Sequence, residues 1–205
     1  MASASFVGIN EGDDRNLATV QRSIASTTVE QTEVAVTLPH VPSYTMVTSA
    51  PVALATASSH LFQFMGSGLN RDLLRRVEIT QVGNAAASRI VEFELRRLDT
   101  SGSGGTAVTP NTVDPVDSAS TARGMILPSS KGTEDELLYK KSGVILQTAA
   151  TVGHREVATF EFPEGTTKPV TTAAGSTTGW VLKNMQSDST ATLLISVTYE
   201  EVFWS

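Results

Sequence analysis

The 205-residue sequence contains no cysteine, and only 18% of its residues are charged and 6% aromatic. The absence of cysteine excludes a disulfide framework and any metal site built from thiolates. The charged fraction lies below the roughly 25% typical of soluble globular domains. Ser, Thr, Ala and Gly make up the difference. A surface solvated by hydroxyl groups is typical of rigid shell and fibre proteins, and it also suits lectin-like modules.

Basic residues are also scarce, because 15 Lys and Arg stand against 21 Asp and Glu, giving a net charge of −6. Without a basic stripe to contact phosphates, no nucleic-acid partner is expected. No apolar run approaches the roughly 18 residues that span a bilayer. The first residues, MASASFVGINEGDD, lack the basic and apolar segments of a signal peptide. We therefore expect no membrane partner and synthesis in a cytoplasm.

The sequence after residue 28 predicts one all-β domain, residues 29–205. Its clearest alternation places Val91, Phe93 and Leu95 on one face of a strand and charged residues on the other. About eight or nine such strands are expected, with almost no convincing helix and no alternation of strands with helices. This pattern favours an antiparallel two-sheet sandwich, either a jelly roll or a related Greek key.

Residues 1–28 differ from the rest and form an N-terminal arm in this interpretation. Leu17, Val20 and Ile24 have helical spacing, and Asp13 or Asp14 could cap a short helix. Two interpretations stay open: a frayed terminus, or an arm that packs on a neighbouring subunit because its few apolar residues cannot form a core alone.

A second helical signal lies in the segment EDELLYKK. Glu136 and Lys140 are spaced i, i+4, as in ion pairs on a helix surface. The segment therefore predicts a helical turn.

A long loop is expected from Asp99 to about Ser120. It contains GSGG, TP and DP, which favour turns through free backbone rotation, a fixed φ angle and side-chain bonding to the backbone, respectively. Loops of this length within a domain are normally functional or disordered. The part from Gly102 to Ser118 is the candidate assembly loop.

Catalytic signals are weak throughout the sequence. His40, His60 and His154 are far apart, and none lies in a metal-binding pattern. His60 lies in an apolar stretch and is interpreted as a hydrogen-bonded structural histidine. The many serines include no GxSxG motif.

Paired carboxylates could suggest glycosidase chemistry. Glu92 and Glu94 share the polar face of one strand, where pairing with Arg96 and Arg97 explains them better. Glu200 and its neighbour Glu201 point to opposite faces of one strand and cannot act together.

Acidic clusters and glycine runs could suggest cation and phosphate sites. The clusters lack calcium-loop spacing, and turn capping beside a proline explains the second of them better. The glycines lie between strands and precede no helix N-terminus. No residue is therefore expected to be catalytic, to bind a cofactor or to ligate a metal. The clusters are Glu11-Asp13-Asp14, Asp114-Asp117 and Glu134-Asp135-Glu136, and the glycines are Gly102, Gly104 and Gly105.

Five aromatic side chains are candidates for stacking on sugar rings: Tyr44, Tyr139, Trp180, Tyr199 and Trp204. Core packing is favoured for Trp180 and Tyr199. Carbohydrate binding stays open as an alternative.

The segment RRLDTSGSGGTAVTPNTVDPVDSAS, from Arg96, resembles a group of tailed-bacteriophage virion structural proteins of the head-decoration or cement type. In that group a strand ending in a basic residue leads to Gly-Gly-Thr-Ala, then Thr-Pro, then Asp-rich turns. SGVILQTAATVGHREVATFEFPEG and GWVLKNMQSDSTATLLISVTYEE resemble the group's late strands. The likeness covers roughly residues 75–202.

The resemblance implies a non-enzymatic, jelly-roll-like component of a bacteriophage virion, foremost a capsid decoration or cement protein, without carrying over any site residue. Implied partners are the major capsid protein or neighbouring virion proteins, and further copies of the chain, often as a trimer. A fibre, neck or baseplate location, and a carbohydrate-binding or receptor-attachment module, are the alternatives. A third hypothesis is an enzyme whose pocket gathers His60 or His154 with carboxylates.

Overall fold

A computed structural model describes residues 17–24, 27–34, 40–68, 70–147, 154–163, 170–172 and 178–202. The chain divides into two compact units, Met1–His40 and Val41–Ser205. Every regular element in the described ranges is a β-strand, so the expectation of an all-β protein is confirmed.

The first unit contains a two-stranded antiparallel sheet. β1 (Leu17–Ile24) pairs with β2 (Thr27–Val34) from Leu17↔Val34 to Ile24↔Thr27. The helix expected from the spacing of Leu17, Val20 and Ile24 is therefore wrong. Three apolar positions predict a helix only weakly. A segment rich in β-branched residues follows after only two residues and pairs with the first segment as a strand. The boundary expected after residue 28 falls inside this hairpin, and the unit extends to His40. The proposed caps Asp13 and Asp14 lie outside the described residues.

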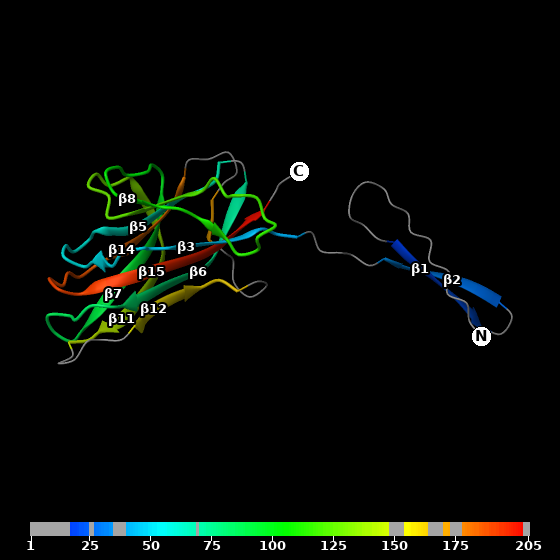
Figure 1. Ribbon diagram of the computed structural model, residues 1–205, viewed down its shortest axis with the longest axis horizontal. Helices are drawn as coiled ribbons and strands as arrows, with labels where there is room; N and C mark the ends of the chain where they lie inside the picture. Colours follow the sequence, from blue (N-terminus) through cyan, green and yellow to red (C-terminus); the bar gives the residue numbers. More distant parts are fainter. Residues whose placement is uncertain are drawn as a thin grey trace. The chain divides into compact units, whose positions relative to one another are not determined.

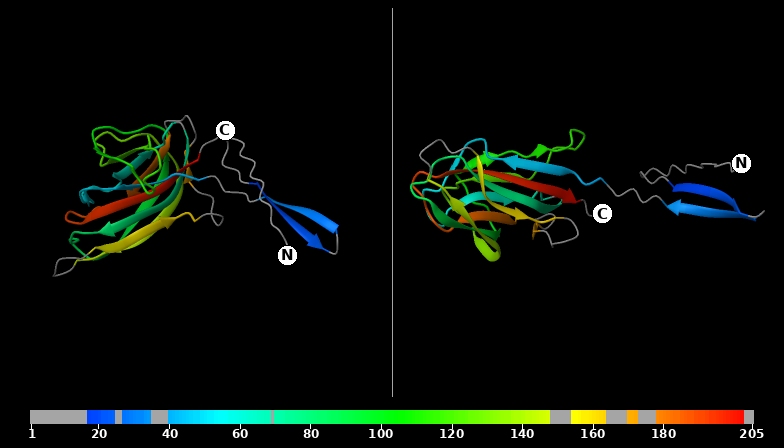
Figure 2. Two further views of the ribbon diagram at one scale, coloured as in Figure 1. Left: turned by 45° about the vertical axis from the view of Figure 1, so that its right-hand side comes forward. Right: turned by 90° about the horizontal axis from the view of Figure 1, so that it is seen from below.

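The second unit contains two antiparallel sheets that pack face to face (Figure 1, Figure 2). One sheet has six strands, in spatial order β11 (Glu134–Ile145), β7 (Arg89–Leu98), β14 (Gly179–Asn184), β5 (His60–Met65), β10 (Arg123–Ile126) and β8 (Thr106–Val108). The other has seven: β12 (Arg155–Glu161), β6 (Arg71–Gln81), β15 (Thr192–Val202), β3 (Ser43–Val47) and β9 (Asn111–Thr112) in order, with β4 (Val52–Ala53) beside β15 and β13 (Val170–Thr171) beside β6. The expected two-sheet sandwich is confirmed, whereas jelly-roll connectivity stays a prediction.

The core lies between the two sheets and follows the alternation in the sequence. Val91, Phe93 and Leu95 are fully buried, as expected, and so are the alternating apolar residues of β15. Burial of each such side chain contributes roughly 1.5–3 kcal/mol, so these two strands supply much of the driving force for folding.

Aromatic side chains join the two sheets at the centre of this core. Trp180 on β14 stacks on Phe64 and Phe62 of β5, with ring centroids 5.2 and 5.8 Å apart. Phe64 in turn meets the ring of Tyr199 on β15 edge-on at 4.8 Å, and Tyr199 stacks on Tyr44 at 5.3 Å. Such pairs add about 0.5–1.5 kcal/mol each beyond area burial.

The helical turn expected in EDELLYKK is wrong, because this segment begins β11. Lys140 lies opposite Glu94 in the ladder with β7, and two register shifts interrupt the pairing before it. Glu136 and Lys140 therefore lie along one edge strand and not on the face of a helix. Pairs of opposite charge stabilise a sheet across strands, just as i, i+4 pairs stabilise a helix. The charge pattern of this segment alone therefore does not distinguish a strand from a helix.

Replacing Trp180 by alanine is expected to lower the free energy of unfolding by about 3–5 kcal/mol, because it removes the ring that stacks on two phenylalanines and leaves a cavity. Val47→Ala is the matched control, since Val47 is 49% exposed and its truncation should change the value by less than about 0.5 kcal/mol. Urea unfolding followed by fluorescence and circular dichroism measures both. Equal effects of the two substitutions would contradict this description of the core.

Candidate functional site

The first half of the long loop after β7 packs on the segment that precedes β11. The backbone N–H of Asp99 donates to the carbonyl of Thr133 at 2.9 Å, and Ser103 and Ser130 exchange two backbone bonds at 2.9 and 3.1 Å. The approach is close, because a Cβ atom on Gly102 would lie 2.4 Å from the Ser130 carbonyl oxygen. Glycine is therefore required at this position for steric reasons.

The second half of the loop passes from one sheet to the other. β8 joins the six-stranded sheet and β9 joins the seven-stranded sheet, so residues 106–112 close this side of the sandwich. Both edge strands are short, which leaves little free edge here for another chain.

The turn after β9 is fixed by its two aspartates. The backbone N–H groups of Val116 and Asp117 donate to Asp114, one to the side chain and one to the carbonyl, both at 3.1 Å. Asp117 Oδ2 accepts from the Ser43 backbone N–H at 3.3 Å, and the Tyr44 hydroxyl donates to the Ser118 carbonyl at 2.9 Å. The interpretation of these aspartates as turn caps is confirmed, and the turn is bonded to the start of β3.

Two valines project from this fixed turn into solvent. Val113 is 58% exposed and Val116 is 83% exposed. Apolar side chains held outward on an ordered backbone form a contact surface that loses little conformational entropy on binding.

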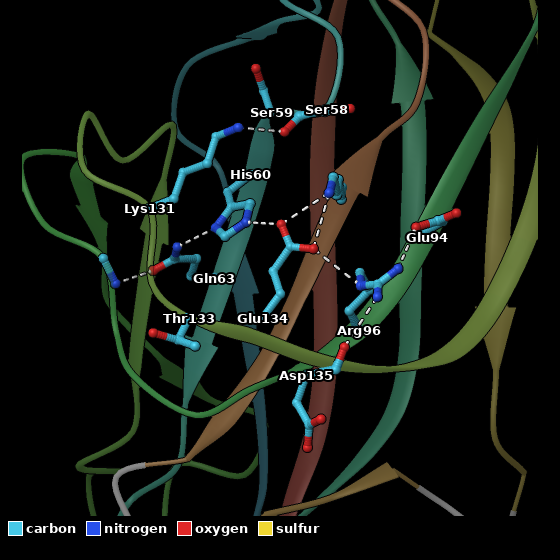
Figure 3. Close-up of polar contacts among 12 residues, drawn as sticks. Ser58, Ser59, His60, Gln63, Glu94, Arg96, Lys131, Thr133, Glu134 and Asp135 are labelled. Atoms are coloured by element: carbon cyan, nitrogen blue, oxygen red, sulfur yellow. Dashed lines mark hydrogen bonds and ion pairs between the residues drawn. The ribbon is translucent and has the colours of Figure 1, made fainter.

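A chain of hydrogen bonds runs from the loop through the buried His60 to Glu134 (Figure 3). The Gly102 backbone N–H donates to Gln63 Oε1 at 2.8 Å, so the other end of this amide, Nε2, is the donor to His60 Nδ1 at 2.6 Å. His60 Nδ1 must therefore be unprotonated, and Nε2–H donates to Glu134 Oε1 at 2.6 Å. Both ring nitrogens are used, and burial lowers the pKa of His60. The interpretation of His60 as a structural histidine fits this geometry.

Glu134, the first residue of β11, is surrounded by cationic groups. Lys183 Nζ lies 3.0 Å from both carboxylate oxygens, and Arg96 Nε lies 3.1 Å from Oε2. Burial acts to raise the pKa of Glu134, but the hydrogen bonds from His60 and Lys183 lower it on balance. The cluster joins β5, β7, β11 and β14 and holds the loop against them.

A second polar cluster lies at the start of β6, where Asp72 faces Glu201 across the ladder with β15. Both are buried. Asp72 Oδ2 accepts from the Thr172 hydroxyl at 2.7 Å and the Ser67 backbone at 2.9 Å, while Oδ1 has no hydrogen-bond partner among the described residues. Burial, with a smaller contribution from the charge of Glu201, raises the pKa of Asp72 to about 6.

Glu201 connects this cluster to the far end of the loop. It accepts hydrogen bonds from Asn70 at 2.9 Å and from the Ser120 hydroxyl. The Tyr199 hydroxyl donates to Ser120 at 2.7 Å, and burial raises the pKa of Tyr199. The loop is therefore bonded at its beginning to Gln63 and at its end to the closing strand.

Sequence reasoning missed the pair of Asp72 and Glu201. A signal was present, since Asp72 lies in the inward register with Leu74, and Glu201 in that with Tyr199. The prediction that Glu200 and Glu201 point to opposite faces is correct, because Glu200 bonds Arg75 at 2.5 Å on the other side.

The carboxylates of β7 lie in ion pairs that differ partly from those expected. Glu94 pairs with Arg96 at 3.0 Å, as expected, but Glu92 pairs with Lys140 at 3.1 Å. Arg97 pairs with Glu136, on β11, at 3.1 Å. The polar face of β7 is therefore joined to the edge strand beside it.

The structure separates the remaining candidates. His40 and His154 are exposed, and no group of three or more His, Cys, Asp or Glu side chains that could hold a metal is found in the described ranges. No helix in the described part is long and apolar enough to cross a membrane.

The aromatic candidates for sugar stacking are mostly buried. Tyr44, Trp180 and Tyr199 are at most 1% exposed and cannot stack on a sugar. Tyr139 is 39% exposed, and Trp204 lies outside the described residues.

A groove of about 520 Å³ lies next to the first half of the loop. Its walls come from residues 65–68, 101–104, 121 and 123–125. They supply glycine backbone, hydroxyl groups, two methionine side chains and the side chain of Arg123. Gln63 forms part of its lining, so the groove borders the hydrogen-bond chain to His60.

No family model matches the sequence, and neither a curated protein nor a solved structure matches it.

The hydrogen-bond chain predicts a single tautomer for His60. Nitrogen NMR at neutral pH should show Nδ1 unprotonated and Nε2 protonated, because Gln63 donates to Nδ1. In Gln63→Glu a carboxylate replaces the donor, and the ring should become an imidazolium with a raised pKa. A protonated Nδ1 in the neutral wild-type ring would contradict the assigned bonds.

Asp72 predicts a pH dependence of stability that Asp72→Asn should remove. The folded-state pKa of about 6 exceeds the ordinary value of 3.8, so the protonated group stabilises the fold below pH 3.8 and this contribution is lost as the pH rises through 6. Relative to the variant, the wild type should lose about 3 kcal/mol in the free energy of unfolding between about pH 3.5 and about pH 7.5. Denaturant titrations at both pH values measure the difference, and parallel profiles would show that Asp72 is not the group responsible.

Proposed function

We propose that this protein is a non-enzymatic structural component of a bacteriophage virion, and that it decorates the capsid as a cement protein. The observation that carries the proposal is the fixed loop from Asp99 to Ser120, which presents Val113 and Val116 to solvent. The resemblance of residues 96–120 to the decoration group of virion proteins supplies the assignment to a virion. The partners in this proposal are the major capsid protein or its neighbours.

The loop has the physical properties of a contact element. Bonds to Gln63 at one end and to Glu201 through Ser120 at the other hold it in place. A partner that binds it therefore does not have to order it, and the affinity is not reduced by that entropy. The contact made by two valines is small, but a closed shell repeats it many times, and repetition raises the total strength of binding.

The first unit supports a role in assembly. A two-stranded sheet such as β1–β2 is marginally stable at best in water. In this proposal a neighbouring subunit supplies further contacts to it. The proposal thus keeps the assembly interpretation of this arm, although the structure of the arm is a hairpin and not a helix.

The alternative of a carbohydrate-binding module loses its main support. Three of its candidates for stacking on sugars are buried in the core: Tyr44, Trp180 and Tyr199. The enzyme alternative expected a pocket that gathers His60 or His154 with carboxylates. His154 is exposed, and the buried His60 contacts one carboxylate, Glu134, with both ring nitrogens in hydrogen bonds.

The proposal predicts that the protein is a stoichiometric part of phage particles made by cells that carry its gene. Particles purified on a density gradient should contain it by mass spectrometry, and immunogold labelling should lie on the head. Val113→Asp/Val116→Asp should reduce its copy number on particles at least about tenfold, since a charge would be buried in each contact. Val47→Asp, which alters a valine that is 49% exposed outside the loop, is the matched control.

Both variants should keep the wild-type circular dichroism and melting temperature. Particles that lack the protein, or labelling confined to the tail, would overturn the assignment to the capsid. Equal copy numbers for the loop variant and the Val47 control would show that the loop is not the contact.

A further inference from the structure

The long edge strand β11 has no role in the proposed function so far. It borders the six-stranded sheet, and among the described strands its ladder partner is β7. It runs for 12 residues, most of them exposed. Edge strands of this kind are templates for pairing with another chain unless they are covered or interrupted.

The neighbouring strand β12 does not take the place of such a partner. It contacts β11 from the inward side, where a Cβ atom on Gly143 would lie 2.2 Å from the Val157 carbonyl oxygen. Lys141 also donates to the Thr159 carbonyl of β12. These contacts close the corner of the sandwich beneath β11, and they leave β11 as the boundary of its sheet.

The sequence of β11 is self-complementary in charge. Two acidic residues, Asp135 and Glu136, are followed by Leu137, Leu138 and Tyr139 and then by two basic residues, Lys140 and Lys141. The pattern is symmetric in position and opposite in charge about Leu138. When two copies of this strand lie antiparallel about Leu138, the acidic end of each lies beside the basic end of the other.

The charged flanks of this pattern, Leu137 and Tyr139 are partly accessible, whereas Leu138 packs against the core and Lys141 bonds Thr159. The ring of Tyr139 meets Phe162 edge-on, with ring centroids 4.9 Å apart. Leu137 is 47% exposed and Tyr139 is 39% exposed. The side chains of Glu136 and Lys140 are 61% and 43% exposed, and each has an intrachain ion pair, with Arg97 and Glu92 respectively. Exposed pairs of this kind contribute little, so they do not prevent either group from binding a second partner.

We propose that β11 is a docking surface for a second copy of this chain, which binds antiparallel about a two-fold axis through Leu138. Such an interface is isologous, since the same residues serve both copies. Leu137 supplies its apolar centre beside the exposed part of Tyr139, and the acidic and basic residues supply its orientation. The cross-strand pair Ile90 and Val144, which are 65% and 40% exposed, extends the apolar surface.

The two register shifts in β11 shape this interface. They lie between Glu134 and Leu137 and between Leu137 and Tyr139, at the centre of the symmetric pattern. Bulges interrupt a regular ladder, so the association rests on side chains and charge, and open-ended addition of strands is disfavoured. The inference is independent of a capsid location.

Three charge variants test the pairing. Lys140→Glu/Lys141→Glu makes the segment all acidic, Asp135→Lys/Glu136→Lys makes it all basic, and the combined four-residue variant exchanges the two ends. The wild-type chain of 21.7 kDa should sediment as a dimer, or as an even multiple of it. Each two-residue variant should dissociate with an affinity at least about a hundredfold weaker, because every attraction becomes a repulsion. The equimolar mixture of the two and the four-residue variant should both recover the dimer.

The control for the acidic variant is Arg123→Glu/Lys131→Glu, which makes the same change in net charge at residues outside β11 and should sediment as the wild type does. Circular dichroism establishes that each variant is folded. Analytical ultracentrifugation across a range of salt should show the wild-type dimer weakening as salt screens the pairs. A monomeric wild type, charge variants that associate as the wild type does, or a mixture that stays monomeric would each overturn the proposal. A dimer that is absent from phage particles would overturn the proposed function and leave this inference standing.

Discussion

The structure depends on one chain of hydrogen bonds, which passes from the Gly102 backbone through Gln63 and His60 to Glu134. Each member fixes the next, because the donor on Gly102 orients the amide and the amide selects the tautomer of the ring. Without this chain, two buried polar side chains, Gln63 and His60, would lose partners at once, at a cost of about 1–3 kcal/mol for each unsatisfied group. The loop that follows β7 is therefore held by the same bonds that satisfy the sheet beneath it.

The two ends of the loop respond to pH in opposite senses. At the first end burial lowers the pKa of His60, so its contribution to stability is complete above about pH 6.5 and falls as the pH drops. At the second end the pKa of Asp72 is raised to about 6, and protonation there stabilises the fold. The charge of Asp188, whose pKa is lowered by its bonds to Arg89 and to the backbone against the effect of burial, favours the fold above its ordinary pKa. The contribution of Asp72 therefore opposes those of His60 and Asp188 as the pH changes.

The sequence predicted what depends on local alternation and missed what depends on distant contacts. The inward faces of β7 and β15 were correct because period-2 burial is visible in any one segment. The helices expected at Leu17–Ile24 and in EDELLYKK were wrong because cross-strand partners override weak helical spacing. The pairing of Asp72 with Glu201 joins strands more than a hundred residues apart, and only the fold brings them together. The virion assignment, which rests on resemblance, stays a prediction.

A shared physical requirement links the loop and the edge strand. A contact surface must remain exposed without collapsing onto its own domain or recruiting unrelated chains. The loop meets this requirement through rigidity, since bonds to Ser43 and Gln63 keep Val113 and Val116 from turning inward. β11 meets it through charge and irregularity, since its bulges interrupt a continuous ladder and its acidic and basic ends reject a strand of the wrong pattern. Both features weaken each single contact and make it more selective for the correct partner. A repeating assembly can use such weak contacts because it makes many of them at once.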